Sequence, residues 1–283
     1  MSANNKERLT DWHSAVFQAY HPVFKRYLAI LIITKEHQLT SQPLRIDILI
    51  IKKIADIPIE AEIGEIFRGH NIVEYKGPDD YISKADYYKA LGYAYIYQAL
   101  EGVSVEDMSL TIVGTRYPRK LLDFIAEERE FTVREKHPGI YVIEGEIFPI
   151  QIIETKKLVG EDNIWLKSLS NNLTAVDLAE LLEAKTKLGV EFKMDAYMNA
   201  IFEANAEVVK EVRAMGSSAL LKVLDEMGLI EEWKQEGERK GIRKGVKRTL
   251  LVIKCLKNNI PIEQIAVESD MPIEEIEKIK SEL

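Results

Sequence analysis

Two acidic residues and a lysine interrupt apolar segments of strand length in the first third of the chain. Asp47 lies in the segment 44–51, and Glu74 and Lys76 lie in the segment 71–76. An ionised carboxylate inside such a segment costs free energy unless another group pairs with it. Residues i and i+2 of a strand point to the same face, so Glu74 and Lys76 are predicted to project together. If the two strands are neighbours, the three groups converge. Two carboxylates can then bind a hard cation such as Mg²⁺, and the lysine can hold a phosphate and an attacking water.

Longer stretches of sequence around these residues resemble one family. The segments 63–81, 86–95 and 165–169 are similar to those of bacterial transposase-like, recombination-promoting nucleases, a branch of the PD-(D/E)XK nuclease superfamily. The resemblance covers more than half of the chain, although the proline of the superfamily name is absent before Asp47. It implies a restriction-endonuclease-like mixed sheet flanked by helices, with DNA as the substrate.

The resemblance also implies roles for the polar residues. Asp47 and Glu74 would ligate a metal, Mg²⁺ with Mn²⁺ as a substitute, together with the backbone carbonyl of Tyr75. Such a metal polarises the scissile phosphate and lowers the pKa of a bound water. Lys76 would orient that water or neutralise charge that develops on the phosphate. Asp47, Glu74 and Lys76 are therefore the expected catalytic residues. The alternative is a solvated pair of Glu74 and Lys76 on an edge strand, with a structural Asp47.

Three auxiliary residues are candidates for the same site. The first helix of such nucleases often supplies one further acid, and Glu36 is the candidate here, with a surface charge at a helix end as the alternative. Lys89 and Tyr93 are four residues apart on a predicted helix and share a face. They could replace the Gln-x-x-x-Tyr pair of related exonucleases, with Lys89 on a phosphate. The alternative is that the tyrosines of this helix mainly supply packing.

Hydrophobic periodicity predicts an α/β layer architecture in the first part of the chain. Helices are expected over 10–38 with a break at Pro22, over 83–100 with a cap formed by Ser83 and Asp86, and over 118–130. Strands are expected at 44–52, 71–76, 107–115, 131–134, 139–143 and 147–153.

From about residue 161 the apolar spacing becomes helical, and the chain is predicted to have three parts. Residues 1–160 form the nuclease-like α/β domain, 161–235 form a helical extension, and 236–283 form a basic glycine-repeat connector with a short helical pair. A glycine inside a helix costs about 1 kcal/mol relative to alanine. The repeat is therefore expected to fray.

The glycine repeat carries the densest cluster of basic side chains in the chain. Its expected DNA-binding residues are Arg239, Lys240, Arg243, Lys244, Lys247 and Arg248. Basic side chains of this kind track phosphates without reading sequence. A solvated connector is the alternative interpretation. The acidic helical pair after Pro261 is poorly suited to a DNA groove, and joining two copies into a homodimer is its alternative role.

Composition limits the setting in which the protein acts. The chain has 283 residues, a net charge of −8 and 46% hydrophobic residues, which is a globular composition. DNA contacts must therefore come from local basic patches. The single Cys255 excludes an intramolecular disulfide, and neither a signal-peptide core nor a membrane-spanning apolar run is present. A cytoplasmic protein without a membrane partner is expected.

These features predict a Mg²⁺-dependent endodeoxyribonuclease of the transposase-like, recombination-promoting type. The alternative is a DNA-binding or assembly protein that keeps the fold but has little catalysis. A third interpretation is an RNA-cleaving enzyme on the same fold. The presence of Asp47, Glu74 and Lys76 together favours the enzyme.

Overall fold

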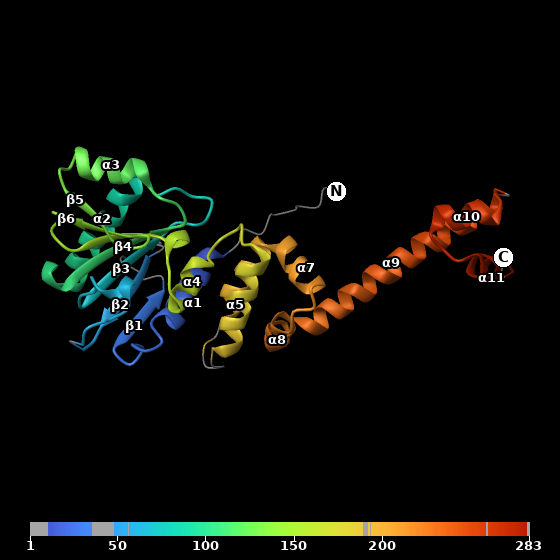
Figure 1. Cartoon of the computed structure of the whole chain (residues 1–283), viewed down its shortest axis with the longest axis horizontal. Helices are drawn as coiled ribbons and strands as arrows, with labels where there is room; N and C mark the ends of the chain where they lie inside the picture. Colours follow the sequence, from blue (N-terminus) through green and yellow to red (C-terminus); the bar gives the residue numbers. More distant parts are fainter. Residues whose placement is uncertain are drawn as a thin grey trace. The chain divides into compact units, whose positions relative to one another are not determined.

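The computed structural model describes residues 11–35, 48–55, 57–188, 192, 194–258 and 260–281, of which Ile48, 229–241 and 244 are described by their backbone alone. The chain forms two compact units, Met1–Leu220 and Leu221–Leu283 (Figure 1). In the described residues, no helix has the length and apolar character needed to cross a membrane.

A mixed sheet is the centre of the first unit. In the described residues it has seven strands, in the order β1-β2-β3-β4-β7-β6-β5. Strand β3 is antiparallel to β2 and parallel to β4, and β4 is parallel to β7. The strands are β1 (Leu31–Lys35), β2 (Ile48–Lys53), β3 (His70–Tyr75), β4 (Met108–Gly114), β5 (Thr132–His137), β6 (Ile140–Glu144) and β7 (Ile150–Glu154).

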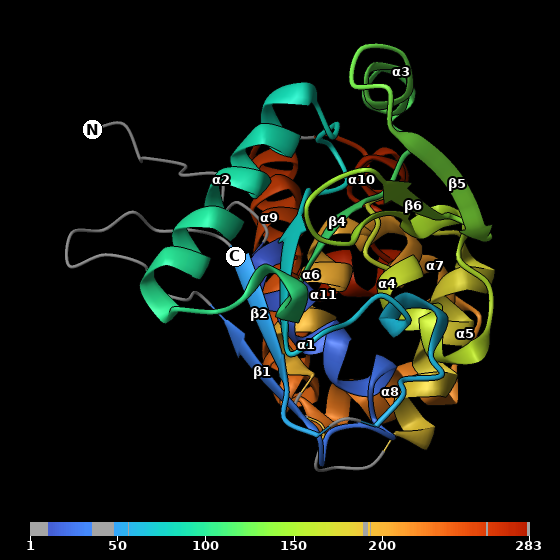
Figure 2. The same cartoon turned by 90° about the vertical axis from the view of Figure 1, so that its left-hand side faces the viewer.

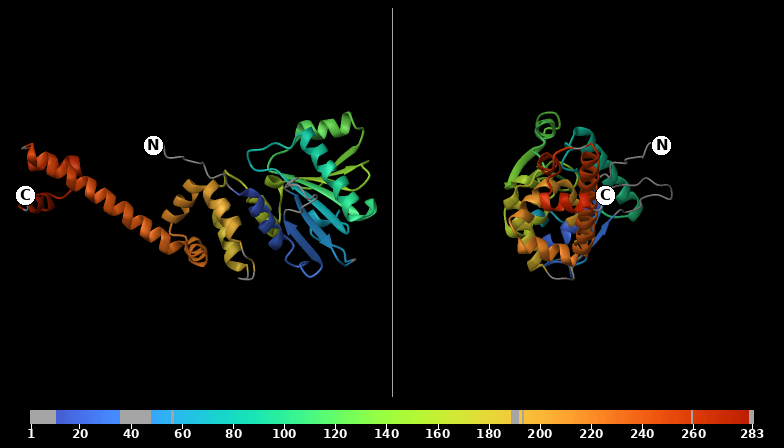
Figure 3. Two further views of the ribbon diagram at one scale, coloured as in Figure 1. Left: turned by 180° about the vertical axis from the view of Figure 1, so that it is seen from behind. Right: turned by 90° about the vertical axis from the view of Figure 1, so that its right-hand side faces the viewer.

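Helices cover both sides of this sheet, as the sequence predicts for an α/β layer architecture. Helices α2 (Lys84–Glu101) and α3 (Arg119–Glu127) bury their apolar sides against one face, where Ile72, Leu110 and Ile152 belong to the same core. Helices α1 (Trp12–Val23) and α4 (Ile164–Lys167) lie on the other side (Figures 2 and 3). Because both faces are covered, every residue of β4 and β7 is buried, including the polar residues Ser109, Thr111 and Gln151.

Helix α2 has the boundaries that the sequence indicates. The Ser83 hydroxyl accepts a hydrogen bond from the Asp86 backbone N–H at 3.2 Å, and the Asp86 carboxylate accepts one from the Ser83 N–H at 2.9 Å. The predicted capping box is therefore confirmed. The helix ends at Gly102, whose φ of +66° is the left-handed conformation that favours glycine. These caps fix the first turn of α2 beside the end of β3.

The expected helix over 10–38 is wrong in its second half. The Asp11 side chain caps α1, but α1 ends at Val23, and Leu31–Lys35 forms the edge strand β1. Strand β1 pairs with β2 over its full length. The apolar run that reads as a continued helix is rich in β-branched side chains, and a neighbouring strand supplies the backbone hydrogen-bond partners that decide its conformation.

The chain after β7 is helical, as the apolar spacing from about residue 161 predicts. In the first unit, α1 packs on α4 and α6, and the Tyr197 hydroxyl of α6 donates to the Trp165 carbonyl of α4 at 2.9 Å. Helices α1, α4 and α6 therefore form one packed group on that side of the sheet. The α-helices after α4 are α5 (Ala175–Lys187), α6 (Asp195–Ala204), α7 (Ala206–Ala214) and α8 (Ser218–Glu226), and the boundary between the two units falls within α8. Short 3-10 turns occur at Glu62–Gly64, Val105–Asp107, Thr155–Lys157 and Glu161–Asn163.

The second unit is built on one long helix. Helix α9 (Leu229–Lys257) runs through Gly237, Gly241 and Gly245, so the repeat is helical where a frayed segment was expected. The two short helices predicted after it are confirmed as α10 (Ile262–Ser269) and α11 (Ile273–Ser281). Both pack on the last turns of α9, around a core of Val252, Cys255, Ile265 and Ile276. Once such packing anchors one end, each further residue adds a helical hydrogen bond, which offsets the glycine cost.

Candidate functional site

The candidate site lies at the carboxyl end of β3. Glu74 is the penultimate residue of this strand and is only 2% exposed. Its Cα partners are Ile48 in β2 and Ile112 in β4. Alternation along β3 turns Glu74 and Ile72 to the face that α2 covers, so a carboxylate is buried at the end of an otherwise apolar layer.

Glu74 and Lys76 share this face, as their spacing predicts. The Lys76 Nζ lies 3.2 Å from Glu74 Oε1 and 2.7 Å from Asp86 Oδ1. The Lys89 Nζ, from the next turn of α2, lies 4.0 Å from the same Glu74 oxygen. Two carboxylates and two ammonium groups thus form a compact cluster, which we call the Glu74 cluster (Glu74, Lys76, Asp86 and Lys89).

Burial dominates the electrostatics of Glu74. Removal from water raises the pKa of its carboxyl, and the positive charges of Lys76 and Lys89 offset this only in part. Glu74 Oε2 is fully buried and has no hydrogen-bond partner among the described residues. An unpaired buried carboxylate oxygen is costly to the fold. Such a cost is typical of a functional site.

Lys76 is held as a cation. Burial acts to lower the pKa of its ammonium, but the carboxylates of Asp86 and Glu74 outweigh burial, and the pKa is raised. Partial burial acts to raise the pKa of Asp86, but hydrogen bonds from Lys76 and Ser83 outweigh it, and that pKa is lowered. Lys76 can therefore supply a fixed positive charge, and it is poorly suited to remove a proton.

Asp86 is a site residue that sequence reasoning missed. Its role as a helix cap was predicted, but that role uses only one of its oxygens: Oδ2 accepts from Ser83, and Oδ1 remains for Lys76. The capping box places this carboxylate in the first turn of α2, directly after the loop that leaves β3. The sequence signal was the short distance along the chain between the strand and the capped helix.

Lys89 and Tyr93 lie on one side of α2, as their spacing predicts. The Lys89 Nζ is 5.2 Å from the centre of the Tyr93 ring, and the Lys89 side chain is 45% exposed. This ammonium group is near the Glu74 carboxylate and open to solvent. It is therefore the member of the Glu74 cluster that is best placed to meet an external anion.

Several predicted site residues lie elsewhere or are outside the described part of the chain. Asp47 and Glu36 are outside it, and Asp47 is the residue before Ile48, the Cα partner of Glu74. Tyr75, whose backbone carbonyl is the predicted ligand, directly follows Glu74 at the end of β3. Its phenol is buried, burial raises its pKa, and its hydroxyl has no partner among the described residues.

The predicted DNA-binding residues belong to the second unit. Arg243 and Lys247 are exposed on α9, whereas Arg248 forms an ion pair with Asp270. The side chains of Arg239, Lys240 and Lys244 are outside the described part of the structure. Of the six predicted residues, Arg243 and Lys247 are therefore the two whose described side chains can reach an external phosphate.

No ready-made multidentate metal site is present in the described residues, since no group of three or more His, Cys, Asp or Glu side chains is arranged to hold an ion. Glu74 is nevertheless suited to contribute to one. Its Oε2 is an anionic oxygen without a partner among those residues, and hard cations bind such oxygens.

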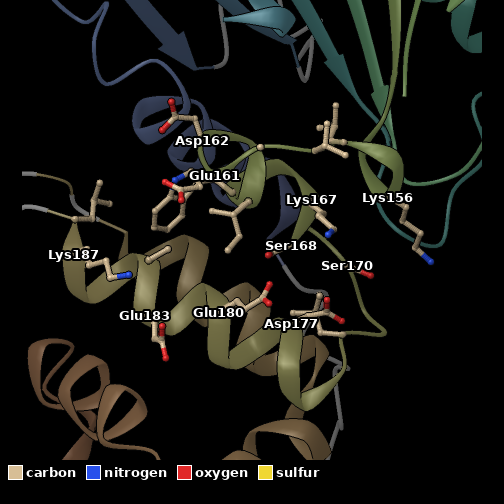
Figure 4. Close-up of a pocket in the computed structure, with 18 of the residues that line it drawn as sticks. Lys156, Glu161, Asp162, Lys167, Ser168, Ser170, Asp177, Glu180, Glu183 and Lys187 are labelled. Carbon is tan, nitrogen blue, oxygen red and sulfur yellow. The ribbon is translucent and has the colours of Figure 1, made fainter. Parts of the chain in front are cut away.

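A cavity of about 1140 Å³ lies in another part of the first unit. It lies between α5 and the segment from Lys156 to Leu173, and none of the four residues of the Glu74 cluster lines it. Figure 4 shows Asp177, Glu180 and Glu183 of α5 on one side and Lys167, Ser168 and Ser170 on the other. Charges of both signs line this cavity, so its side chains do not select one class of ligand.

Comparisons of the chain with models of protein families, with curated proteins and with solved structures found no match.

Proposed function

We propose that the protein is a metal-dependent endodeoxyribonuclease that hydrolyses phosphodiester bonds at the carboxyl end of β3. The observation that carries this proposal is the state of Glu74. Its carboxylate is buried, one oxygen faces Lys76 and Lys89, and the other has no partner among the described residues. The unpaired oxygen suits a cation, and the two ammonium groups suit a phosphate.

The donor set suits Mg²⁺, with Mn²⁺ as a substitute. Glu74 would hold the ion through its unpaired oxygen, with the Asp47 carboxylate and the Tyr75 backbone carbonyl as the other protein ligands. When bound, such an ion polarises a phosphodiester and lowers the pKa of a coordinated water. The like charges of the two carboxylates also need a counter-ion, which favours binding of the ion even without DNA.

The remaining residues of the Glu74 cluster would position and stabilise the substrate. Lys76 would face the scissile phosphate with a fixed positive charge, because Asp86 holds its ammonium group in place. Lys89 would bind a second oxygen of the phosphate from the solvent side. Asp86 would act through Lys76 and is therefore a positioning residue, while Tyr93 supports Lys89.

The architecture is compatible with a restriction-endonuclease-like fold. A mixed sheet with helices on both sides is what the sequence resemblance implies. Glu74 lies on a strand whose antiparallel neighbour, β2, begins one residue after Asp47. The transposase-like, recombination-promoting type within the superfamily is proposed from the sequence segments alone.

A catalytically weak DNA-binding or assembly protein on the same fold is the second candidate. The observation that favours it is the pairing of Lys76, whose ammonium is already engaged by both Glu74 and Asp86. In an enzyme this ammonium must exchange part of these contacts for a phosphate. In a scaffold the same contacts only compensate a buried charge.

Incubation of the purified protein with supercoiled plasmid separates the two candidates. The enzyme is expected to nick or linearise the plasmid with Mg²⁺ or Mn²⁺ but not with EDTA, and Asp47→Asn prepared in the same way is expected to be inactive. Without DNA, Mg²⁺ at ten times its Kd should stabilise the wild type by about 1.4 kcal/mol. Plasmid cleavage that is equal in Asp47→Asn, or that persists in EDTA, would refute the assignment.

We propose in addition that the basic repeat of α9 is an auxiliary DNA arm. Reversing the charge of the two exposed residues, with Arg243→Glu and Lys247→Glu in the full chain, should weaken DNA binding. It should also reduce the slope of log affinity against log salt by about two. Single-turnover cleavage at saturating DNA should stay the same, because neither residue belongs to the Glu74 cluster.

The matched control for the arm is a double reversal elsewhere, Lys210→Glu with Lys222→Glu, since both side chains are exposed on other helices. Light scattering on the same samples tests the alternative role of the tail. If the α9 variant turned a dimer into a monomer while DNA affinity was unchanged, the tail would be an assembly element.

A further inference from the structure

Three parallel strands end side by side at the edge of the sheet that holds Glu74. Strand β3 is parallel to β4, and β4 is parallel to β7, so their carboxyl ends share one edge. The segments that leave these ends are 76–82, 115–118 and 155–158. Ligands of open α/β sheets bind at the carboxyl ends of such strands. The side chains of these segments therefore lie at the same edge of the sheet as Glu74.

An exposed tyrosine backed by an arginine joins the first two segments. Tyr81 is 65% exposed, and the Arg116 guanidinium lies 4.9 Å from the centre of its ring. The Arg116 Nη1 also donates to the Tyr81 hydroxyl at 2.7 Å. The Thr115 hydroxyl donates to the Pro78 carbonyl at 3.3 Å, which ties the same two segments together. The ring is thus held in place while most of its surface faces water.

A second exposed tyrosine joins the next two segments. Tyr117 is 42% exposed and packs edge-on against Tyr141, with the Lys157 Nζ 5.7 Å from the centre of its ring. Lys157 in turn donates to the Tyr141 hydroxyl at 3.0 Å. We call the set of Tyr81, Arg116, Tyr117 and Lys157 the aromatic edge.

The charge of these segments contrasts with that of the chain. The three segments contain four basic residues and two acidic ones, whereas the whole chain has a net charge of −8. One of the two acids, Asp79, accepts a hydrogen bond from Asn171. Two of the four cations already face carboxylates, Lys76 those of Glu74 and Asp86 and Lys157 those of Glu135 and Glu154. The edge therefore combines exposed aromatic rings with Arg116 and Lys156 as the basic side chains left for an external anion, which suits a polyanion that carries flat apolar groups.

We propose that the aromatic edge binds unpaired nucleotides next to the scissile phosphate, so that the substrate is single-stranded or frayed DNA. Proteins that bind single strands combine basic side chains along the backbone with aromatic rings on which bases stack. Bases inside a duplex are stacked on each other and cannot stack on Tyr81 or Tyr117. The proposal rests on the proposed nuclease function, because the aromatic edge lies at the carboxyl ends of β3, β4 and β7, where Glu74 also lies.

Binding measured without cleavage tests the proposal. A 20-nucleotide DNA labelled with fluorescein, as a single strand or as a duplex of the same sequence, is titrated with the full chain in EDTA and read by fluorescence anisotropy. Stacking of one base contributes about 1–3 kcal/mol by alanine substitution. We therefore expect the single strand to bind at least about fivefold more tightly than the duplex.

Variants of the two tyrosines test whether a preference for single-stranded DNA comes from the aromatic edge. Tyr81→Ala with Tyr117→Ala should weaken single-strand binding about tenfold or more and duplex binding by less than about twofold. Tyr81→Phe with Tyr117→Phe keeps both rings and should retain the preference. Tyr95→Ala is the matched control, because Tyr95 is also 42% exposed but packs on Phe148, which precedes β7 at the opposite edge of the sheet.

The outcomes separate this proposal from the nuclease assignment. Equal affinity for both DNAs, no detectable binding, or an equal loss in the Tyr95 control would overturn the role of the aromatic edge, even if the wild type cleaves plasmid. A single-strand preference that depends on the two tyrosines would support the edge, even if the wild type cleaves nothing, in which case the nuclease function fails alone.

Discussion

Glu74→Gln is expected to reduce Mg²⁺-dependent plasmid cleavage by at least about 100-fold and to stabilise the fold at pH 8. Mutation of a residue that only supports a metal ligand typically lowers metal affinity or activity 10- to 100-fold. Mutation of a direct ligand should therefore lower activity by at least about 100-fold. The gain in stability has a separate cause. The substitution removes a buried charge whose second oxygen has no partner among the described residues, and we expect about 1 kcal/mol in the free energy of unfolding.

The gain from Glu74→Gln should depend on pH in a defined direction. Burial raises the pKa of Glu74 in the folded state above its ordinary value of 4.5. Between these two pKa values the folded state binds more protons than the unfolded state, so the stability of the wild type falls as pH rises. Glutamine does not titrate. The difference in unfolding free energy between the variant and the wild type should therefore reach its maximum above the folded pKa of Glu74 and vanish below about pH 4.5.

Plasmid assays and urea unfolding at pH 4, 6 and 8 measure both effects. Loss of cleavage together with a gain in stability that grows with pH identifies Glu74 as a residue kept for function at a cost to the fold. If Glu74→Gln instead destabilises the protein at pH 8, the Glu74 carboxylate is a structural ion-pair partner of Lys76, and the metal-ligand assignment loses its main support.

Lys76→Ala is expected to destabilise the protein by about 3 kcal/mol at pH 8, in addition to abolishing cleavage. Removal of one partner of a buried ion pair leaves a charge without compensation and costs 3–5 kcal/mol. The lower end applies because Lys76 is 16% exposed. Lys76 is the counter-ion of both Glu74 and Asp86, so its removal leaves two carboxylates without compensation.

The destabilisation by Lys76→Ala should also shrink as pH falls. The lowered pKa of Asp86 contributes stability that is present above its ordinary value of 3.8 and is lost as pH falls through the folded pKa. Without Lys76 this contribution disappears, and the Glu74 charge becomes more costly. Both effects require ionised carboxylates, so the difference in unfolding free energy between the variant and the wild type should shrink as pH falls and close only below the folded pKa of Asp86, which lies under 3.8.

Lys89→Ala is the control for Lys76→Ala. The Lys89 ammonium is 4.0 Å from the same Glu74 oxygen but is 45% exposed, so its removal should cost less than about 1 kcal/mol. Urea unfolding of the two variants at pH 8 compares them directly. Equal stabilities of the two variants would mean that Lys76 does not compensate the buried charge.

Local signals in the sequence determined most of the first unit and the chemistry of its candidate site. Alternation predicts β3 and the shared face of Glu74 and Lys76, because residues two apart in a strand always project together. Ser83 and Asp86 predict the start of α2, because a capping box needs only residues three apart. The short helices α10 and α11 follow from apolar spacing in the same way.

Contacts between residues distant in sequence decided the rest. Leu31–Lys35 became a strand because β2 lies beside it, and no local pattern encodes that partner. Lys89 joined the Glu74 cluster because α2 packs on the face of the sheet that carries Glu74. The unpaired oxygen of Glu74 likewise arises from burial under α2, since the free energy of a charge depends on everything packed around it. The sequence by itself therefore determined which groups could do chemistry, and only the tertiary structure decided which of them meet.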